Sequence, residues 1–270
     1  MAQAFVGSSP TSRTSLDTYH TFEDYLKSKR LAETTIESKN NIVNQLSHHC
    51  NLWNLNEVRN HIERSNWVNG RKNLVLFAYQ DWCVWKGFKF DVDKFRESDS
   101  KIPFIPKEEQ LDALISASSK RYAPLLQLDK ESGWRVIELS RLKPSDFDLS
   151  RGTAILNCPA KGSLPRQIKM SQRLVSMLSP LIAKTPAGNR IWAVKPRNLG
   201  ENFSRIRKKT AEKLGDTAIN KITLKTFRHF KGTMTYHQTK DILFTMRVLG
   251  HKRIENTLVY THLLPRAQWK

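Results

Sequence analysis

Apolar side chains recur with helical spacing through the first 90 residues of the chain. Phe22, Tyr25 and Leu26 fall on one face of the first predicted helix. The same periodicity predicts further helices over residues 36–47, 54–62 and 72–85. This part of the chain is therefore expected to be all-helical.

Capping and turn residues give these helices their expected ends. Thr34 and Thr35 suit the N-cap of the second helix, because a hydroxyl oxygen there accepts a backbone N–H. Asn69 followed by Gly70 is typical of a break between helices. Four of the seven tryptophans lie in the same segment, at positions 53, 67, 82 and 85. Aromatic residues at helical spacing favour a place in the core over base stacking.

The pattern changes after residues 91–106, a polar segment that ends in two prolines and reads as a linker. Two β-rich runs, residues 153–157 and 166–170, flank a turn at residues 160–163 and predict an antiparallel hairpin. Helices are predicted from Pro106 onward and over residues 122–129, 136–142, 174–183, 202–214, 224–236 and 242–249. The expected fold class is mainly α with a small antiparallel β-sheet (α+β).

Charge separates the two parts of the chain more sharply than hydropathy does. The chain has 45 Lys and Arg against 25 Asp and Glu, a net charge of +20. Residues 1–100 contribute a balance of +1, and residues 101–270 a balance of +19. A domain this basic attracts polyanions, of which nucleic acid is the commonest. An acidic membrane surface is the rival partner, but the chain has no run of 18 apolar residues.

The basic part ends in side chains suited to attack a phosphodiester without a metal ion. The set begins with Lys225, Arg228 and His229. His251 follows 23 residues after Arg228, and Tyr260 follows nine residues after His251. Cationic groups can hold a phosphate, a phenol can attack it, and a histidine can steady the developing charge.

No metal or other cofactor is expected. Asp146 and Asp148, the tight acidic pair of the basic part, lie at a predicted turn, where Asp is favoured as a solvated residue. The three cysteines are far apart and lack the paired spacing of a zinc site. A Gly-rich phosphate loop is also missing from the sequence. A metal-dependent nuclease is therefore disfavoured.

The C-terminal set resembles the motif of the tyrosine recombinases, the phage-integrase and Xer type of site-specific DNA recombinase. In that family His-x-x-Arg is followed by Gly-His, and then by a tyrosine nine residues later. Arg228, the Gly250–His251 pair and Tyr260 match this pattern. The first position departs from it, because this chain has Lys225 where the family usually has His.

The resemblance also implies a domain organisation. A helical core-binding (SAM-like) DNA-binding domain is expected over residues 16–90, and the tyrosine-recombinase catalytic domain over residues 107–270. Residues 91–106 would link the two domains, which would close around DNA. Residues 1–15, rich in Ser and Thr, read as a flexible N-terminal arm.

By the same resemblance, Arg135 and Arg228 grip the scissile phosphate through their planar guanidinium groups. His251 hydrogen-bonds a nonbridging oxygen. Tyr260 is the nucleophile and forms a 3′-phosphotyrosine, which stores the bond energy, so that no ATP is needed.

The remaining roles fall to lysines and supporting residues. Lys161, in the hairpin turn, would protonate the leaving 5′ oxygen, and Lys225 would clamp charge rather than accept a proton. Glu138 and His229 would help to order the site. The substitutes for Lys161 are Lys143, Arg166 and Lys169. One very basic predicted helix offers Arg205, Arg207, Lys208 and Lys209 to DNA.

The resulting hypothesis is a cytoplasmic site-specific recombinase that cuts and rejoins double-stranded DNA. A homo-tetramer is expected on paired DNA sites, with a monomer or weak oligomer in solution. Two alternatives stay open. One is a DNA-relaxing activity of the type IB topoisomerase kind, because some of those enzymes are similar in carrying Lys at the position of Lys225. The other is a non-catalytic DNA-binding protein on the same scaffold.

Overall fold

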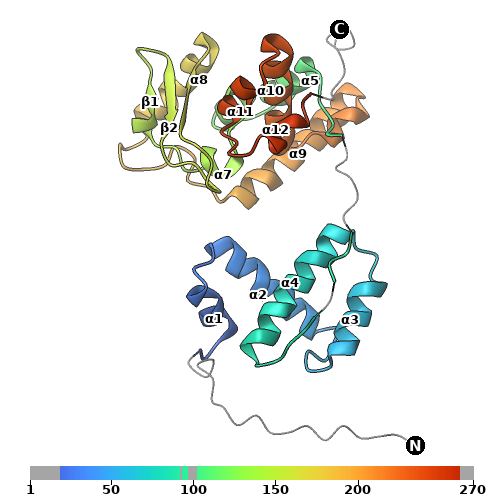
Figure 1. The fold of residues 1–270 in the computed structure, drawn as a ribbon. Coiled ribbons are helices and arrows are strands. Elements are labelled where there is room, and N and C mark those ends of the chain that lie inside the picture. Colours follow the sequence, from blue (N-terminus) through green and yellow to red (C-terminus); the bar gives the residue numbers. More distant parts are fainter. Residues whose placement is uncertain (1–18, 92, 97–101, 262–270) are drawn as a thin grey trace, which may run out of the picture. The chain divides into compact units, whose positions relative to one another are not determined.

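The computed structural model describes residues 19–91, 93–96 and 102–261. The chain divides into two compact units, Met1–Ser100 and Lys101–Lys270 (Figure 1). The N-terminal arm predicted for residues 1–15 and the tail after Thr261 lie outside the described residues. Each unit is described by itself.

The first unit is a bundle of four helices around one core. The helices are α1 (Phe22–Ser28), α2 (Glu33–Ser47), α3 (Leu55–Arg64) and α4 (Asn69–Trp85). Phe22, Tyr25 and Leu26 are all buried, as predicted, and α2 packs along α4. Asn54 caps α3 by accepting the Glu57 backbone N–H at 3.2 Å.

Two predicted helix starts in this unit are wrong. Helix α2 begins at Glu33, because the Ala32 carbonyl already accepts the backbone N–H groups of the first turn. Thr34 and Thr35 therefore lie inside the helix and do not cap it. Asn69 and Gly70 open α4 instead of marking a break.

The tryptophans of this unit divide between core and surface. Trp82 is buried and Trp85 packs against the core, as predicted. Trp53 is 59% exposed, and its ring makes an edge contact with Trp82 at 5.4 Å between centroids. Trp67 is also exposed. Helical spacing correctly predicted the core position of Trp82 and Trp85, which lie on α4. It gives no information on Trp53 and Trp67, which lie between helices.

The start of the segment predicted as a linker is fastened to the first unit. Asn73 of α4 donates through Nδ2 to the Phe95 carbonyl oxygen at 2.9 Å, and its Oδ1 accepts the Phe95 N–H at 2.9 Å. Phe90 is buried in the same core.

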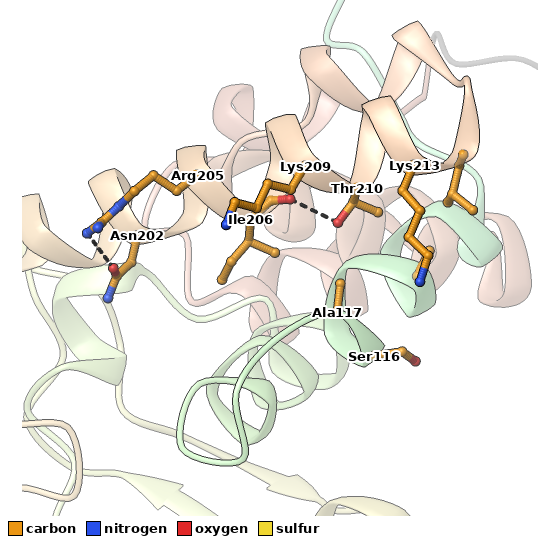
Figure 2. A pocket seen from close by; sticks show the side chains of 10 residues that line it. Ser116, Ala117, Asn202, Arg205, Ile206, Lys209, Thr210 and Lys213 are labelled. Carbon is orange, nitrogen blue, oxygen red and sulfur yellow. Dashed lines mark hydrogen bonds between the residues drawn. The ribbon is translucent and has the colours of Figure 1, made fainter.

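In the part of the chain that the structure describes, the second unit combines eight α-helices and two 3-10 turns with one small sheet. The helices are α5 (Glu108–Ser116), α6 (Ala123–Ser132), α7 (Val136–Leu139), α8 (Gln172–Lys184), α9 (Pro196–Leu214), α10 (Leu224–Thr239), α11 (Ile242–Leu249) and α12 (Glu255–Leu258), with a 3-10 turn at Thr217–Lys221. A further 3-10 turn spans Pro144–Asp146. The basic helix α9 runs beside the end of α5 (Figure 2).

The sheet has three antiparallel strands in the order β1-β2-β3. These are β1 (Phe147–Asp148), β2 (Thr153–Leu156) and β3 (Arg166–Lys169). Ala154 pairs with Ile168 in the predicted hairpin. The fold class predicted from the sequence, mainly α with a small antiparallel sheet, is confirmed.

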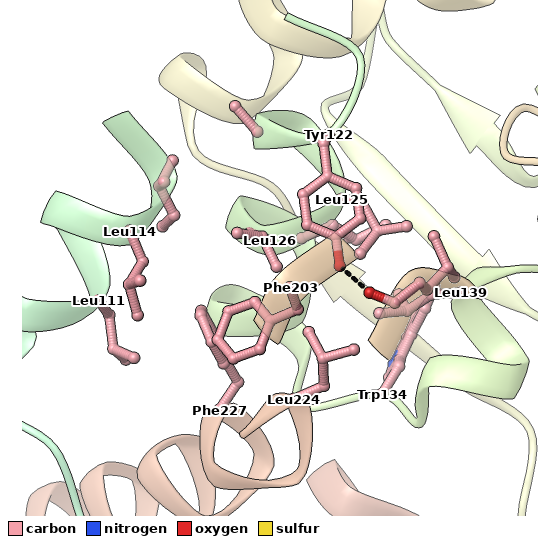
Figure 3. Close-up of a cluster of buried hydrophobic side chains, with 14 of the residues drawn as sticks. Leu111, Leu114, Tyr122, Leu125, Leu126, Trp134, Leu139, Phe203, Leu224 and Phe227 are labelled. Atoms are coloured by element: carbon pink, nitrogen blue, oxygen red, sulfur yellow. Dashed lines mark hydrogen bonds between the residues drawn. The ribbon is translucent and has the colours of Figure 1, made fainter. Parts of the chain in front are cut away.

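Helix α6 forms the centre of the second unit's core. It packs against α5, α8 and α10, and most of its residues are buried. Phe203 of α9 and Phe227 of α10 meet edge to face in this core (Figure 3). The Tyr122 hydroxyl donates to the Leu199 carbonyl oxygen at 2.8 Å. This packing fixes α6 against α10, the two helices that deliver the residues described next.

Candidate active site

Arg228 is a buried guanidinium that joins the ends of two other helices. It lies in the second turn of α10 and is only 8% exposed. Its Nη1 donates to the Gly133 carbonyl oxygen and its Nη2 to the Leu249 carbonyl oxygen, both at 2.7 Å. Burial first, then the charge of Arg135, lowers the pKa of Arg228 to about 10. The side chain therefore stays charged at neutral pH.

Gly133 ends α6 and turns the chain toward Arg135, the other arginine of the site. It ends α6 in the left-handed conformation, with φ of 62°. A side chain there would be strained and would also approach Lys231 of α10 to 3.1 Å. Arg135 follows two residues later as the N-cap of α7. Both predicted arginines are thus positioned at this one turn.

Glu138 is the fully buried counter-ion of the site. Its carboxylate accepts the Arg135 backbone N–H at 2.8 Å and the Arg135 guanidinium at 3.2 Å. It also accepts the Ala160 backbone N–H at 3.1 Å and Arg166 Nη2 at 2.5 Å. Burial would raise the pKa of Glu138, but these donors prevail and hold it below its usual value. An ionised Glu138 therefore orients Arg135.

Arg166 and Ser163 belong to the same cluster, although the sequence did not single out either for it. Arg166 was considered only as a substitute for Lys161, yet its side chain is 5% exposed and paired with Glu138. The Ser163 hydroxyl accepts Arg135 Nη1 at 2.8 Å and donates to the Gly250 carbonyl oxygen. The sequence carries no signal for this pairing, because only the fold brings the hairpin strand to the buried Glu138.

His251 is held in a neutral form next to these arginines. Gly250 ends α11 in the left-handed conformation, and the His251 ring then faces Thr257 of α12, with Nδ1 2.8 Å from the Thr257 hydroxyl. Burial first, and then the charge of Arg228, lowers the pKa of His251 to about 3. A neutral imidazole can donate one N–H to a phosphate oxygen.

Tyr260 lies buried after α12, with its hydroxyl oxygen 3.3 Å from Nδ1 of His229. Burial raises the pKa of Tyr260 to about 12, although the charge of Arg228 opposes this. The pKa of His229 is lowered to about 4 by burial and then by Lys225 and Arg228. The group beside the phenol is therefore a neutral histidine.

The two predicted catalytic lysines are exposed. Lys225 lies in the first turn of α10, and its charge acts on His229. Lys161 lies in the loop between β2 and β3 with a left-handed φ of 53°. Both lie outside the cluster formed by Arg135 and the buried side chains of Arg228, His251 and Tyr260.

The residues predicted to bind DNA lie along α9. Arg205 and Lys209 line a pocket of about 690 Å³ between α9 and α5, together with Lys213 (Figure 2). Lys208 is exposed on the same helix. Arg207 differs from its neighbours, because its Nη1 donates to the Ile222 carbonyl oxygen at 2.8 Å. Its guanidinium is therefore used inside the fold.

The described residues contain neither a cluster of metal-ligating side chains nor a helix that could span a membrane. Residues 19–91, 93–96 and 102–261 contain no group of three or more His, Cys, Asp or Glu that could hold a metal ion. Within the same ranges, no helix has both the length and the apolar character needed to cross a bilayer.

Comparisons with known proteins agree with this geometry. The profile of the Phage integrase family matches residues 106–266, more than half of the chain. Tyrosine recombinase XerA of Thermococcus onnurineus is 26% identical over 77% of this chain and 78% of its own length. Tyrosine recombinase XerC of Bacillus pumilus is 26% identical over 73% of this chain and 68% of its own length.

Solved structures share the fold. The crystal structure of XerA recombinase has a TM-score of 0.51 at 22% identity, covering 92% of this chain and 94% of that one. The Tn1549 transposon integrase in complex with transposon right-end DNA has a TM-score of 0.66 at 15% identity, covering 92% and 96%. With the profile match and the arrangement of Arg135, Arg228, His251 and Tyr260, the chain belongs to the phage integrase family and is a tyrosine recombinase, an enzyme that transfers DNA strands.

Proposed function

We propose that this protein cuts and rejoins double-stranded DNA at specific sites through a covalent bond to Tyr260. The observation that carries the proposal is an excess of positive charge around one buried carboxylate, in a cluster whose Arg228 also acts on the phenol of Tyr260. Arg135, Arg166 and Arg228 face one ionised carboxylate, that of Glu138. Both nearby histidines are neutral. A site with more cations than anions is suited to an anionic ligand, and a phosphodiester supplies one negative charge.

The proposed reaction is a metal-free displacement at phosphorus. The Tyr260 hydroxyl oxygen bonds to phosphorus as its proton passes to Nδ1 of His229, and the bond from phosphorus to the 5′ oxygen breaks. Lys161 gives a proton to that 5′ oxygen, and Arg135 and Arg228 neutralise the nonbridging oxygens. A 5′ hydroxyl from a second strand then reverses the step and frees Tyr260. One phosphodiester is broken for each one formed.

The surroundings of the phenol bear on the timing of its proton transfer. A hydroxyl with a pKa of about 12 is almost fully protonated at neutral pH. His229 at 3.3 Å can accept its hydrogen bond, but with a pKa of about 4 it is too weak a base to remove the proton beforehand. We infer that the proton leaves as the new bond to phosphorus forms. His229 thereby takes a more direct role than the sequence assigned to it.

A nicked suicide substrate provides the test, because loss of the short cleaved strand traps the covalent intermediate. The wild-type protein should form an adduct with DNA in the presence of EDTA, and Tyr260→Phe should form none. Arg207→Ala is a matched control, since it removes a cation of the same unit that is bound within the fold. An adduct that survives in Tyr260→Phe, or one that requires Mg²⁺, would refute the proposal.

The assembly on DNA is a separate part of the proposal. Residues 16–90 would bind the DNA beside the catalytic domain, and four copies would hold two sites. The recombinases of known structure include several described in complex with DNA. Relaxation of plasmids that lack any recombination site would favour a topoisomerase-like activity instead. Sequencing the joined ends from paired sites distinguishes the two outcomes.

A further inference from the structure

Gly232 lies in the middle of α10, where its backbone gives no reason for a glycine. The residue has helical backbone angles, and it is not among the glycines with positive φ. Glycine weakens a helix interior relative to alanine, because it loses more conformational freedom on folding. An interior glycine that needs no special φ indicates that a neighbour occupies the space of a side chain.

That neighbour is the hydroxyl end of Tyr260. A Cβ atom at Gly232 would lie 2.6 Å from Cζ of Tyr260 and 2.8 and 2.9 Å from the two Cε atoms. These atoms carry and flank the nucleophilic oxygen. The bare Cα of Gly232 is therefore the surface against which the reactive end of the ring rests.

His229 completes this contact from the preceding turn of α10. Residues three apart lie on one face of a helix, so His229 and Gly232 both face the phenol. His229 contacts the hydroxyl oxygen at 3.3 Å, while Gly232 lies under the ring carbon that bears it. Together, His229 and Gly232 determine how far the Tyr260 hydroxyl lies from α10 and which way it points.

The ring has little freedom to move away from an added side chain. Tyr260 is 2% exposed, and its backbone N–H donates to the Thr257 carbonyl oxygen at 3.0 Å. Thr257 also contacts His251 through its hydroxyl at 2.8 Å. A ring displaced from α10 would therefore change the placement of Tyr260 or strain the segment that holds His251.

We propose that Gly232 is a positioning residue that sets where the Tyr260 hydroxyl meets the scissile phosphate. The proposal rests on the function proposed above for Tyr260. A methyl group at position 232 must push Cζ from 2.6 Å to an ordinary contact, a shift of about 1 Å. A misplacement of about 1 Å can slow a reaction about 100-fold.

The test compares Gly232→Ala with Gly200→Ala in single-turnover adduct formation on saturating nicked DNA. Gly200 is the matched control, a glycine in α9 whose added Cβ would meet nothing within 4 Å. Gly232→Ala should slow adduct formation about 100-fold, while its affinity for DNA stays within twofold of wild type. Gly200→Ala should leave both values within twofold. A Gly232→Ala rate within twofold of wild type, or a rate loss matched by an equal loss in affinity, overturns the proposal.

A melting-temperature cycle tests the contact without relying on catalysis. Gly232→Ala should lower the melting temperature of the wild-type protein and raise it in a Tyr260→Ala background, where the helix gains alanine and the clash is gone. The same shift in both backgrounds overturns the contact. If wild-type protein forms no adduct at all, the proposed function fails, whereas this cycle still decides whether Gly232 seats Tyr260.

Discussion

At the scale of single residues, the phenol of Tyr260 has a different neighbour from the one the sequence suggested. The motif directed attention to Lys225, because it replaces a histidine of the family pattern. The structure brings His229 to the hydroxyl and leaves Lys225 exposed. Sequence spacing identifies candidate residues for a site. It does not determine which atoms are in contact, because that depends on which side chains of α10 face Tyr260 and on how the Tyr260 ring is oriented.

Replacing His229 by Phe should therefore slow adduct formation more than replacing Lys225 by His. Phe keeps an aromatic ring beside Tyr260 but loses the nitrogen that accepts its hydrogen bond. We expect a loss of about 10- to 100-fold, at or below the lower end of what a positioned proton acceptor contributes. Lys225→His should retain cleavage with an unchanged pH profile. A profile altered by Lys225→His, with His229→Phe as fast as wild type, would assign the proton acceptor to position 225.

The pKa values of the two histidines predict the pH dependence of the free enzyme. Lowered values of about 4 for His229 and about 3 for His251 mean that both rings are protonated only in acid. The pH profile of kcat/KM reports groups of the free enzyme. It should show no inflection near 6.5, the ordinary pKa of histidine, and should rise with pH below about 10, where a growing fraction of Tyr260 ionises while Arg228 keeps its charge. An inflection near 6.5 that disappears in His251→Gln would contradict this picture.

At the scale of elements, caps and glycines explain which helices could be predicted. Helix α11 has the bounds expected from the sequence, since Asp241 accepts the Phe244 N–H at its start and Gly250 ends it. The starts of α2 and α4 were missed because Ala32 and Val68 precede them without a side-chain cap. A helix start that is capped by a side chain can be recognised in a sequence. A helix start without a side-chain cap cannot, because any residue can supply the backbone carbonyl.

Helix α6 contains a buried acid that the proposed reaction does not use. Both carboxyl oxygens of Asp129 are buried without a hydrogen-bond partner. Burial raises the pKa of Asp129 well above 3.8, although the charge of Arg228 opposes the shift. In the unfolded chain the same group ionises with a pKa of about 3.9. The folded state thus keeps a proton that the unfolded state loses.

It follows that Asp129 destabilises the fold increasingly as pH rises above about 4, until the raised pKa of the folded state is reached. Asp129→Asn should increase the free energy of unfolding at pH 7, because asparagine has no proton to lose when the chain unfolds. The gain should disappear below about pH 4, where both states are protonated. Urea unfolding at pH 4 and pH 7 measures it, with Glu212→Gln at an exposed position of α9 as control. Equal effects of Asp129→Asn at both pH values would show that Asp129 is ionised in the fold.

At the scale of the whole molecule, the charge break near residue 100 anticipates the division into two units. Nearly all excess positive charge lies in the unit with the candidate site, but net charge does not say which cations are free. Arg207 shows the difference, because it counts toward the balance of +19 while its guanidinium binds a backbone carbonyl. Only the folded structure separates cations that face solvent from those used internally.

Binding of DNA by the full chain should weaken steeply with salt, because each phosphate contact releases a counterion. The logarithm of the affinity should fall linearly with the logarithm of salt concentration. Lys208→Ala and Lys209→Ala, which remove exposed cations of α9, should each reduce the magnitude of that slope by about 1. Arg207→Ala should keep the slope and lower the melting temperature, since it removes a bond to Ile222. Fluorescence anisotropy between 50 and 200 mM salt, roughly the range over which such contacts are resolved, measures all three variants. If Arg207→Ala flattens the slope as much as the lysine variants do, its guanidinium leaves Ile222 to contact phosphate, and α9 rearranges when DNA binds.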